Sequence, residues 1–537
     1  MMQTSGVHGA EIVFLLLLLF VVLFGYLAKK LETPYPIVLV VGGLLLSFIP
    51  GIPRVSLNPD LVFLAVLPPL LYHAAWLTSW REFSYHLVSI IFLAFGLVGF
   101  TVFGVTEAGQ WILPGFDWRV GLVLGAVVAP TDAIAATTIA NRIGLPKRLV
   151  DILEGESLLN DATALLALEF GIALLVGGER PTFTMGLLRL LYLTFVGIAT
   201  GLVLGEIVHQ VEDRIEDGPI EIALSLLTPY VAYLAAESIH ASGVLAVVAC
   251  GLYLSRKSSH FFSPMVRLQS WAVWDSLTFI LNGFVFVLIG LQLPYVLGAI
   301  GEYKPMTLLI YGGAFSLFLI LLRLIWMYPG AYVANLIRRR LLHQKEPMPS
   351  ARAIFVAGWT GMRGVISLAA ALALPSVLAN GAPFPQRNLI VFLAFSVILV
   401  TLVLQGLTLP PLIRALGLAG AASSSTEEKA ARRAMAEAAL EHLEETRQKH
   451  GANLDEVYDD LAQHYRHRLA TLNDGDSADP AAVIFYKTFI DLSRDLIQVE
   501  RRTAIEMRRQ RRISDSLLRD LEYELDLSEI RLVKKKS

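Results

Sequence analysis

Apolar segments of membrane-spanning length recur along this chain as far as about residue 414. About 20 apolar residues, at about 1.5 Å of helical rise each, cross the hydrocarbon layer of a bilayer. Because backbone groups in lipid must be hydrogen-bonded internally, we expect each segment to be a helix. The sequence therefore predicts an all-α polytopic membrane protein with about thirteen spans, over residues 11–28, 34–50, 59–79, 85–107, 118–140, 151–176, 185–210, 219–238, 242–255, 271–292, 307–335, 352–375 and 388–414.

Lysine and arginine residues at the ends of these segments predict the orientation of the chain. Loops rich in these residues alternate with loops that have few, and basic loops tend to stay in the cytoplasm. The basic loops hold Lys29 and Lys30, Arg81, Arg142, Lys147 and Arg148, Arg256, Lys257 and Arg267, and Arg338, Arg339, Arg340 and Lys345. We therefore expect the N-terminus outside and the C-terminal tail in the cytoplasm. The formal net charge of −2 does not indicate nucleic-acid binding.

The composition changes after the last apolar segment, which predicts two domains, a transmembrane domain over 1–415 and a tail over 416–537. The tail is rich in Glu, Lys, Arg, Ala and Leu. Its pattern predicts amphipathic cytoplasmic helices near 425–449, 453–471, 480–509 and 512–530. Two interpretations stay open for it: a regulatory domain that binds an unidentified regulator, and a solvated helical appendage that aids assembly.

The span at 151–176 contains the polar motif Gly155-Glu156-Ser157-Leu158-Leu159-Asn160-Asp161. A charge at the bilayer centre is costly, so an ionisable residue there indicates a functional site. On a helix, Glu156 and Asn160 are four residues apart, as are Ser157 and Asp161, so the polar side chains share one side. That side must face the protein interior.

Three further ionisable residues are predicted at the depth of Asp161. Counted from the cytoplasmic ends of their spans, these residues lie about nine to fifteen positions inward, near the midplane at about 1.5 Å per residue. They are Asp132, Arg323 and Arg363. Two of the spans also contain helix-breaking residues at that depth. Pro130 precedes Thr131 and Asp132, which can cap a new half-helix, and three glycines fall within 358–364. Two interrupted helices in corresponding positions are typical of the binding site of a secondary transporter.

Structural roles are open for most of these residues. Asp132 could serve only as a helix cap. Glu156, Arg323 and Arg363 could form a charge-neutralising ion pair, and we favour this role for them. Asn160 could make a structural hydrogen bond, and Ser157 and Thr131 could bond to their own helix.

The charge count sets Asp161 apart. Three midplane acids face two arginines, so one carboxylate requires a proton or a cation such as Na⁺, and either one neutralises it. If only the neutral site reorients, the result is one-for-one exchange that depends on pH.

Four motifs together resemble one family. They are Ala129-Pro-Thr-Asp-Ala-Ile-Ala135, Gly155-Glu-Ser-Leu-Leu-Asn-Asp161, Asn282-Gly-Phe-Val-Phe-Val-Leu-Ile-Gly290 and Gly361-Met-Arg-Gly-Val-Ile-Ser-Leu-Ala369. They are similar to those of the monovalent cation/proton antiporters of the NhaP and sodium/proton exchanger type, over about 1–415. The tail segment 520–532 resembles the tail of a bacterial branch.

The resemblance implies two inverted six-helix repeats with discontinuous core helices, in a cell (plasma or inner) membrane. The core would comprise spans at about 85–176 and 307–414. The scaffold, at about 11–79 and 185–292, would form a homodimer, and transport would follow an elevator-like alternating access. The transported ions would be Na⁺ or Li⁺, or K⁺, and protons, with no separate cofactor.

By the same resemblance, Asp161 would hold the cation or the proton, with Asn160 as its partner. Thr131 and Ser157 would be oxygen ligands of a monovalent Na⁺, and Asp132 a further ligand or a cap. The ion pair would join Glu156 to Arg323 or Arg363. An asparagine before the aspartate goes with electroneutral exchange.

The sequence departs from the family at His73, where many members have an acid that lines the cation path. A buried neutral histidine and a pH-titrating residue on the access path are both open. Other functions also stay open: K⁺/H⁺ exchange, a transport-incompetent sensor that signals through the tail, and a channel. We do not expect an enzyme, because no nucleophile–base constellation is found.

Overall fold

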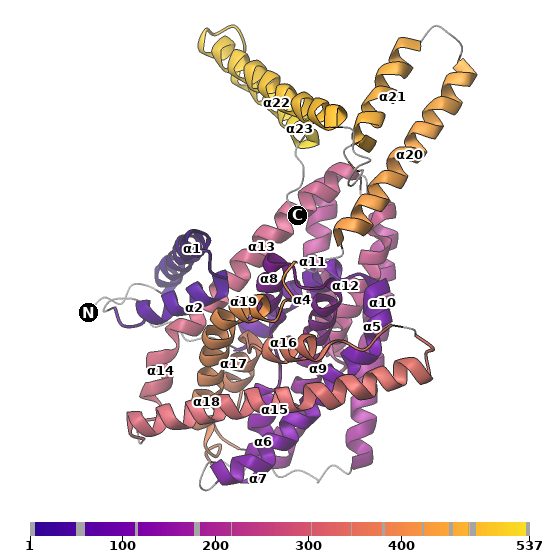
Figure 1. Cartoon of the computed structure of the whole chain (residues 1–537). Helices are drawn as coiled ribbons and strands as arrows, with labels where there is room; N and C mark the ends of the chain where they lie inside the picture. The colour runs from indigo at the N-terminus through magenta and orange to yellow at the C-terminus, as the bar shows by residue number, and fades with distance from the viewer. Residues whose placement is uncertain are drawn as a thin grey trace. The chain divides into compact units, whose positions relative to one another are not determined.

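The structure is a computed structural model. It describes residues 6–49, 59–112, 116–176, 183–215, 217–261, 263–301, 303–344, 346–378, 382–420, 424–450, 455–470, 472 and 480–532. These residues are almost entirely helical, and their only strand-like pairing is an isolated bridge between Val377 and Pro383. The chain forms two compact units, Met1–Ala422 and Ser423–Ser537, which are described separately (Figure 1).

The first unit contains helices that follow the predicted apolar segments closely. The helices are α1 (Gly6–Lys30), α2 (Tyr35–Leu46), α3 (Pro59–Leu61), α4 (Leu67–Leu77), α5 (Trp80–Ile91), α6 (Val98–Ile112), α7 (Trp118–Val128), α8 (Ala133–Ile143), α9 (Lys147–Val176), α10 (Phe183–Glu212), α11 (Gly218–Ser238), α12 (Gly243–Phe261), α13 (Pro264–Leu291), α14 (Leu293–Gly298), α15 (Pro305–Arg340), α16 (Ala351–Trp359), α17 (Val365–Leu372), α18 (Arg387–Val400) and α19 (Gly406–Ala415). Single π-helical turns join α3 to α4, α5 to α6 and α18 to α19.

Nine helical runs in the described part are long and apolar enough to cross a membrane. They are Glu11–Lys30, Pro59–Leu77, Trp80–Trp111, Lys147–Leu175, Thr184–Glu212, Gly218–Ser238, Pro264–Gly298, Pro305–Arg340 and Arg387–Ala415. The all-helical, multi-span class is therefore confirmed. Thirteen spans and inverted repeats stay predictions, because α2 has only 12 residues and two predicted spans are divided.

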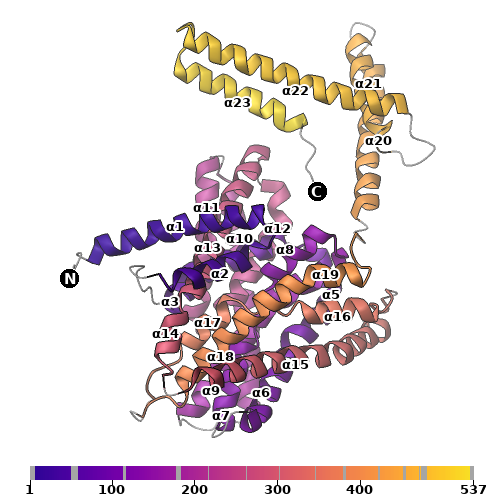
Figure 2. The ribbon, with the colours of Figure 1, turned by 60° about the vertical axis from the view of Figure 1, so that its left-hand side comes forward.

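Both predicted interruptions are confirmed. The first divided span ends at Val128 and resumes at Ala133, and the second ends at Trp359 and resumes at Val365. The two interrupted spans pack against each other through α7 and α17, and α9 packs against α7, α8 and α16. Figure 2 shows α16 and α17 close to α15 and α18. The polar motif of α9 therefore lies beside both breaks.

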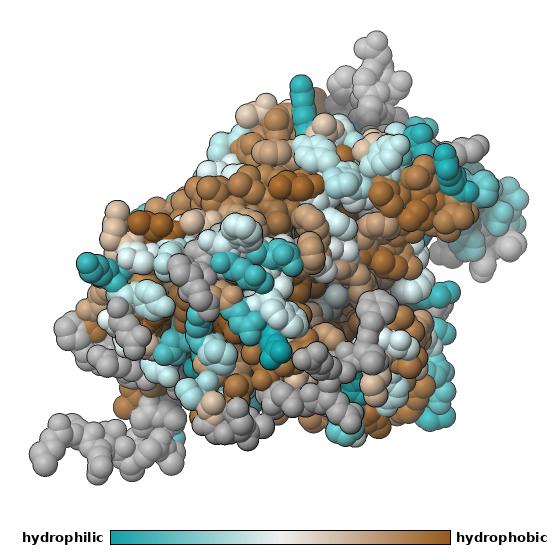
Figure 3. All heavy atoms as spheres, turned by 90° about the horizontal axis from the view of Figure 1, so that it is seen from below, coloured by the Kyte–Doolittle hydropathy of each residue, from teal (hydrophilic) through white to brown (hydrophobic). Residues whose placement is uncertain are grey.

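Large apolar side chains are exposed over much of the first unit, among them Phe103, Phe195 and Leu309. Figure 3 shows hydrophobic side chains over large parts of the face seen from below. A soluble protein rarely exposes contiguous apolar surface of this extent, whereas lipid covers it without cost. The surface therefore fits a membrane-embedded unit.

The second unit consists of the four predicted amphipathic helices, α20 (Ser424–His450), α21 (Asp455–Ala470), α22 (Pro480–Arg509) and α23 (Asp515–Leu532). They pair as two hairpins, α20 with α21 and α22 with α23. Arg501 joins α22 to α23 through Asp526 at 2.8 Å and Glu529 at 2.7 Å. Surface pairs of this kind contribute little each, so the hairpins also depend on apolar packing.

Candidate functional site

The two interrupted helices meet at their breaks. The backbone N–H of Asp132, between α7 and α8, donates to the carbonyl of Met362, between α16 and α17, over 2.8 Å. An interrupted helix leaves amides and carbonyls without helical partners, and in a membrane these must be satisfied by other protein groups. This backbone bond is one such solution.

Asp132 lies at the N-terminal ends of two half-helices. Its carboxylate caps α8 by accepting from the backbone N–H of Ile134 at 2.8 Å. A Cβ added at Gly364, directly before α17, would overlap the same carboxylate. Helix N-termini favour negative charge, so the carboxylate lies where both half-helices attract it. The cap is one of the two roles predicted from the sequence.

Gly364 provides a test of this close approach. We expect Gly364→Ala to displace the Asp132 carboxylate and to destabilise the protein by about 1–3 kcal/mol, the usual cost of overpacking. The measurement is thermal unfolding of the purified protein in detergent. Gly313→Ala is the control, because a Cβ there would meet no atom within 4 Å. Equal melting temperatures for the two variants would contradict the packing described.

The buried arginines lie at the opposite, C-terminal ends of the half-helices. Arg363 donates through Nε to the carbonyl of Val128, at the end of α7, over 3.0 Å. Arg323 donates through Nε and Nη2 to the carbonyls of Gly358 and Ala357, near the end of α16, each over 3.2 Å. Helix C-termini favour positive charge. Each arginine therefore stabilises carbonyls that the interruption exposes.

Glu156 pairs with Arg323, which resolves the alternative left open by the sequence. Nη1 and Nη2 of Arg323 contact Oε1 and Oε2 of Glu156 at 2.5 and 2.9 Å, and both side chains are at most 2% exposed. This fork-to-fork geometry is the strongest arrangement for a buried pair. Arg363 makes no ion pair within the described ranges.

Asn160 and Thr131 extend this network. The Asn160 Nδ2 donates to the hydroxyl and the carbonyl of Thr131, over 2.7 and 3.2 Å. The Thr131 hydroxyl in turn donates to Glu156 Oε1 over 2.9 Å. Asn160 is therefore a structural link between α9 and the first interruption, as one of the predicted roles proposes. Because the Thr131 hydroxyl already donates and accepts, it has little freedom to turn.

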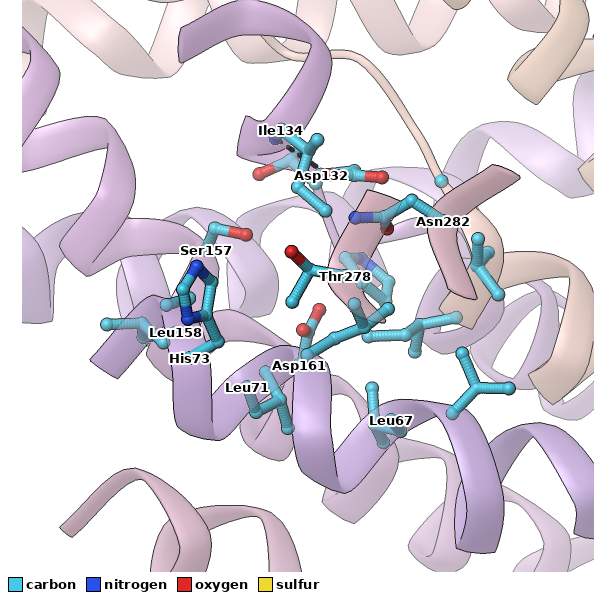
Figure 4. A pocket seen from close by; sticks show the side chains of 18 of the residues that line it. Leu67, Leu71, His73, Asp132, Ile134, Ser157, Leu158, Asp161, Thr278 and Asn282 are labelled. Atoms are coloured by element: carbon cyan, nitrogen blue, oxygen red, sulfur yellow. Dashed lines mark hydrogen bonds between the residues drawn. The ribbon is translucent and has the colours of Figure 1, made fainter. Parts of the chain in front are cut away.

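Asp161 faces a different environment from Glu156. Its side chain is 4% exposed and lines a cavity of about 380 Å³ together with Thr131, Asp132, Ser157 and His73 (Figure 4). Within the described part of the chain, Asp161 makes no ion pair. The structure thus brings five of the predicted residues to one cavity, and the Glu156–Arg323 pair and Arg363 lie outside its lining.

His73 lies in the wall of this cavity and of a second one. Its ring stacks on Trp274 with a centroid distance of 5.6 Å and an interplanar angle of 9°. Its Nε2 is 3.7 Å from Oδ1 of Asp275, which is 72% exposed. The second cavity, about 370 Å³, is lined by His73, Trp274 and Asp275. His73 therefore lines both the Asp161 cavity and the second cavity.

The sequence prediction missed several polar residues of the cavity wall, among them Tyr35 of α2, and Thr278 and Asn282 of α13. Asn282 begins one of the four motifs, and Thr278 precedes it by four residues, so both lie on one helical face. That spacing was the available signal. Tyr35 carries no such signal, because only the packing of α2 against α13 places it here.

The comparison with protein families agrees with this geometry. The family model described as sodium/hydrogen exchanger, transmembrane, matches residues 15–415, which include the whole site. The chain belongs to this family. The resemblance predicted from the four motifs is therefore confirmed, and the chain is a member of a family of multi-pass membrane transporters.

Individual relatives of this exchanger chain are similar over most of their length. An "uncharacterized Na⁺/H⁺ exchanger" of Mycobacterium bovis is 35% identical, covering 98% of this chain and 97% of that protein. A sodium, potassium, lithium and rubidium/H⁺ antiporter of Bacillus pumilus is 33% identical over 82% of this chain and 66% of that protein. The Na⁺/H⁺ antiporter ApNhaP of Aphanothece halophytica is 32% identical, over 77% of this chain and 75% of that protein.

A solved structure shows the same fold. The sodium proton antiporter MjNhaP1 of Methanocaldococcus jannaschii matches with a TM-score of 0.59 at 20% identity, covering 76% of this exchanger chain and 99% of that chain. At this identity the match concerns the fold alone. The all-helical class predicted from the sequence is consistent with it.

Proposed function

We propose that this chain exchanges Na⁺ or Li⁺ for H⁺ across a cell membrane, one for one, and that both ions use Asp161. The observation that supports this most is the contrast between two buried carboxylates of α9. Glu156 is neutralised by Arg323, whereas Asp161 lines a cavity and has no ion pair within the described ranges. A buried carboxylate without a fixed counter-ion needs a mobile one.

Exchange follows if only the neutral site moves across the membrane. A proton or a monovalent cation neutralises Asp161, and binding of one excludes the other, so each crossing carries a single positive charge. Ser157, Thr131 and Asp132 line the cavity and would supply further oxygen atoms to the cation. We propose alternating access of elevator type, in a homodimer, with the tail inside the cell as a binding surface for a regulator.

The experiment that tests this function is ion-dependent proton efflux from proteoliposomes. We expect Na⁺ and Li⁺ to release protons from acid-loaded vesicles, with no effect of membrane potential on the rate. Because protons compete for the same carboxylate, the half-saturating Na⁺ concentration should rise by up to about tenfold for each unit by which the pH falls. Strong acceleration by an imposed potential would contradict one-for-one exchange.

Exchange of K⁺ for H⁺ is the second candidate. It is favoured by the Bacillus relatives, whose names include potassium and rubidium beside sodium and lithium. The same vesicles with K⁺ in place of Na⁺ separate the two candidates. A half-saturating concentration for K⁺ equal to that for Na⁺ would indicate a broad cation site.

A further inference from the structure

One wall of the Asp161 cavity comes from α13, which is neither of the interrupted helices nor the helix of the polar motif. Thr278 and Asn282 of α13 line the cavity together with Asp132 and Asp161 (Figure 4). The two residues are four positions apart on one continuous helix, so their side chains share a face. This face supplies two polar groups for which the proposed function has no role so far.

Asn282 has an oxygen atom that needs a partner. The side chain is 5% exposed, and its Oδ1 accepts no hydrogen bond within the described part of the protein. A buried polar atom without a partner costs about 1–3 kcal/mol, so native proteins rarely retain one without a reason. Amide carbonyl oxygens, like carboxylates and hydroxyls, are ligands that hard cations prefer. A cation in the cavity would satisfy this atom.

Thr278 presents a hydroxyl oxygen that can also act as a cation ligand. Its hydroxyl donates to the carbonyl of Trp274, one turn earlier, over 2.8 Å. The hydroxyl proton is therefore engaged within the helix, and the lone pairs of Oγ1 stay available to a positive partner. The two side chains together offer neutral oxygen ligands on one wall, where Asp161 supplies the negative charge.

We propose that Asn282 and Thr278 form the α13 half of the cation site and set its affinity and its preference among monovalent ions. This rests on the proposed function, which it extends. The carboxylate of Asp161 attracts any cation, whereas neutral oxygens at fixed positions distinguish ions by size. A cation held between α9 and α13 also joins the interrupted helices to the wall that they would move against. The cation would therefore leave the α13 oxygens, but not Asp161, when the loaded site moves.

The test uses the full-length protein in proteoliposomes, with Na⁺, Li⁺ and K⁺ in turn. Loss of one ligand should raise the half-saturating Na⁺ concentration about tenfold in Asn282→Ala, and about threefold in Thr278→Val, with little change in the maximal rate. The ratio of the half-saturating Na⁺ concentration to the half-saturating K⁺ concentration should change as well. Asn335→Ala is the matched control, because Asn335 is a buried asparagine with an unpartnered Oδ1 that does not line the cavity. We expect it to stay within about twofold of the parent protein.

A binding measurement separates this inference from the proposed function. The rise in melting temperature on replacing choline chloride by NaCl reports cation binding without transport. A parent protein that binds Na⁺ without exchanging it would overturn the exchange function. The inference would then still be tested by the melting-temperature shift, which should be smaller in Asn282→Ala than in the parent protein. A shift as large in Asn282→Ala as in Asn335→Ala would overturn the inference, as would a parent protein with no Na⁺-dependent shift. If Asn282→Ala does not fold, Thr278→Val, which preserves side-chain volume, decides.

Discussion

Replacing Asp161 by asparagine should abolish Na⁺-dependent proton efflux while leaving the protein folded. The amide keeps the size and polarity of the side chain, but it holds neither a proton nor a net charge to exchange at ordinary pH. We expect at least a hundredfold loss of exchange rate in proteoliposomes, because the residue is the proposed carrier of both ions. The melting temperature should not fall, since the substitution removes an uncompensated buried charge.

Glu212→Gln is the matched control for this result. Glu212 is 2% exposed, has an oxygen without a hydrogen-bond partner, and does not line the Asp161 cavity. It therefore shares the burial of Asp161 without sharing its position. We expect this variant to exchange within about threefold of the parent protein, the range of a modest structural change. Persistent exchange in Asp161→Asn, or equal losses in the two variants, would refute a special role for Asp161.

Features that depend on local sequence could be predicted for this protein. Pro130 removes a helical hydrogen bond wherever it lies in a helix, so the end of α7 at Val128 follows from the sequence. Asp132 is a favourable cap directly after it, and it does cap α8. The constant helical rise also predicts a depth for each residue. Asp132, Asp161, Arg323 and Arg363 were expected at one depth, and the first two share a cavity.

Features that depend on how helices pack could not be predicted. Both Arg323 and Arg363 are predicted at the depth of Glu156, and only the packing of α15 against α16, and of α16 against α9, selects Arg323 as its partner. The positions of Thr278 and Asn282 in the cavity wall also depend on helix packing. Their spacing indicates a polar face of α13, but nothing local to α13 shows that this face meets the interrupted helices.

Breaking the Glu156–Arg323 pair should cause a large loss of stability. In Glu156→Gln the guanidinium of Arg323 stays buried without a counter-ion, and removal of one partner of a buried pair typically costs about 3–5 kcal/mol. The hydroxyl of Thr131, which contacts this carboxylate at 2.9 Å, keeps only an uncharged amide oxygen as acceptor. We expect a large fall in melting temperature and in the yield of folded protein. Glu32→Gln, which breaks an exposed pair with Arg142, should cost less than about 1 kcal/mol.

The double variant Glu156→Leu with Arg323→Met tests whether the ion pair is needed only for stability or also for the geometry of the Asp161 site. Apolar residues of similar volume often replace a buried pair without loss, so much of the stability lost in Glu156→Gln should return. Exchange should not return, because Thr131 then lacks its acceptor and the carbonyl of Gly358 lacks its donor, while that of Ala357 keeps only the hydroxyl of Thr360. The pair would then serve to hold both interruptions open beside Asp161. Full exchange in the double variant would show instead that the two charges only neutralise each other, and that the remaining bonds, such as that from Asp132 N–H to the carbonyl of Met362, are enough to hold the interrupted helices.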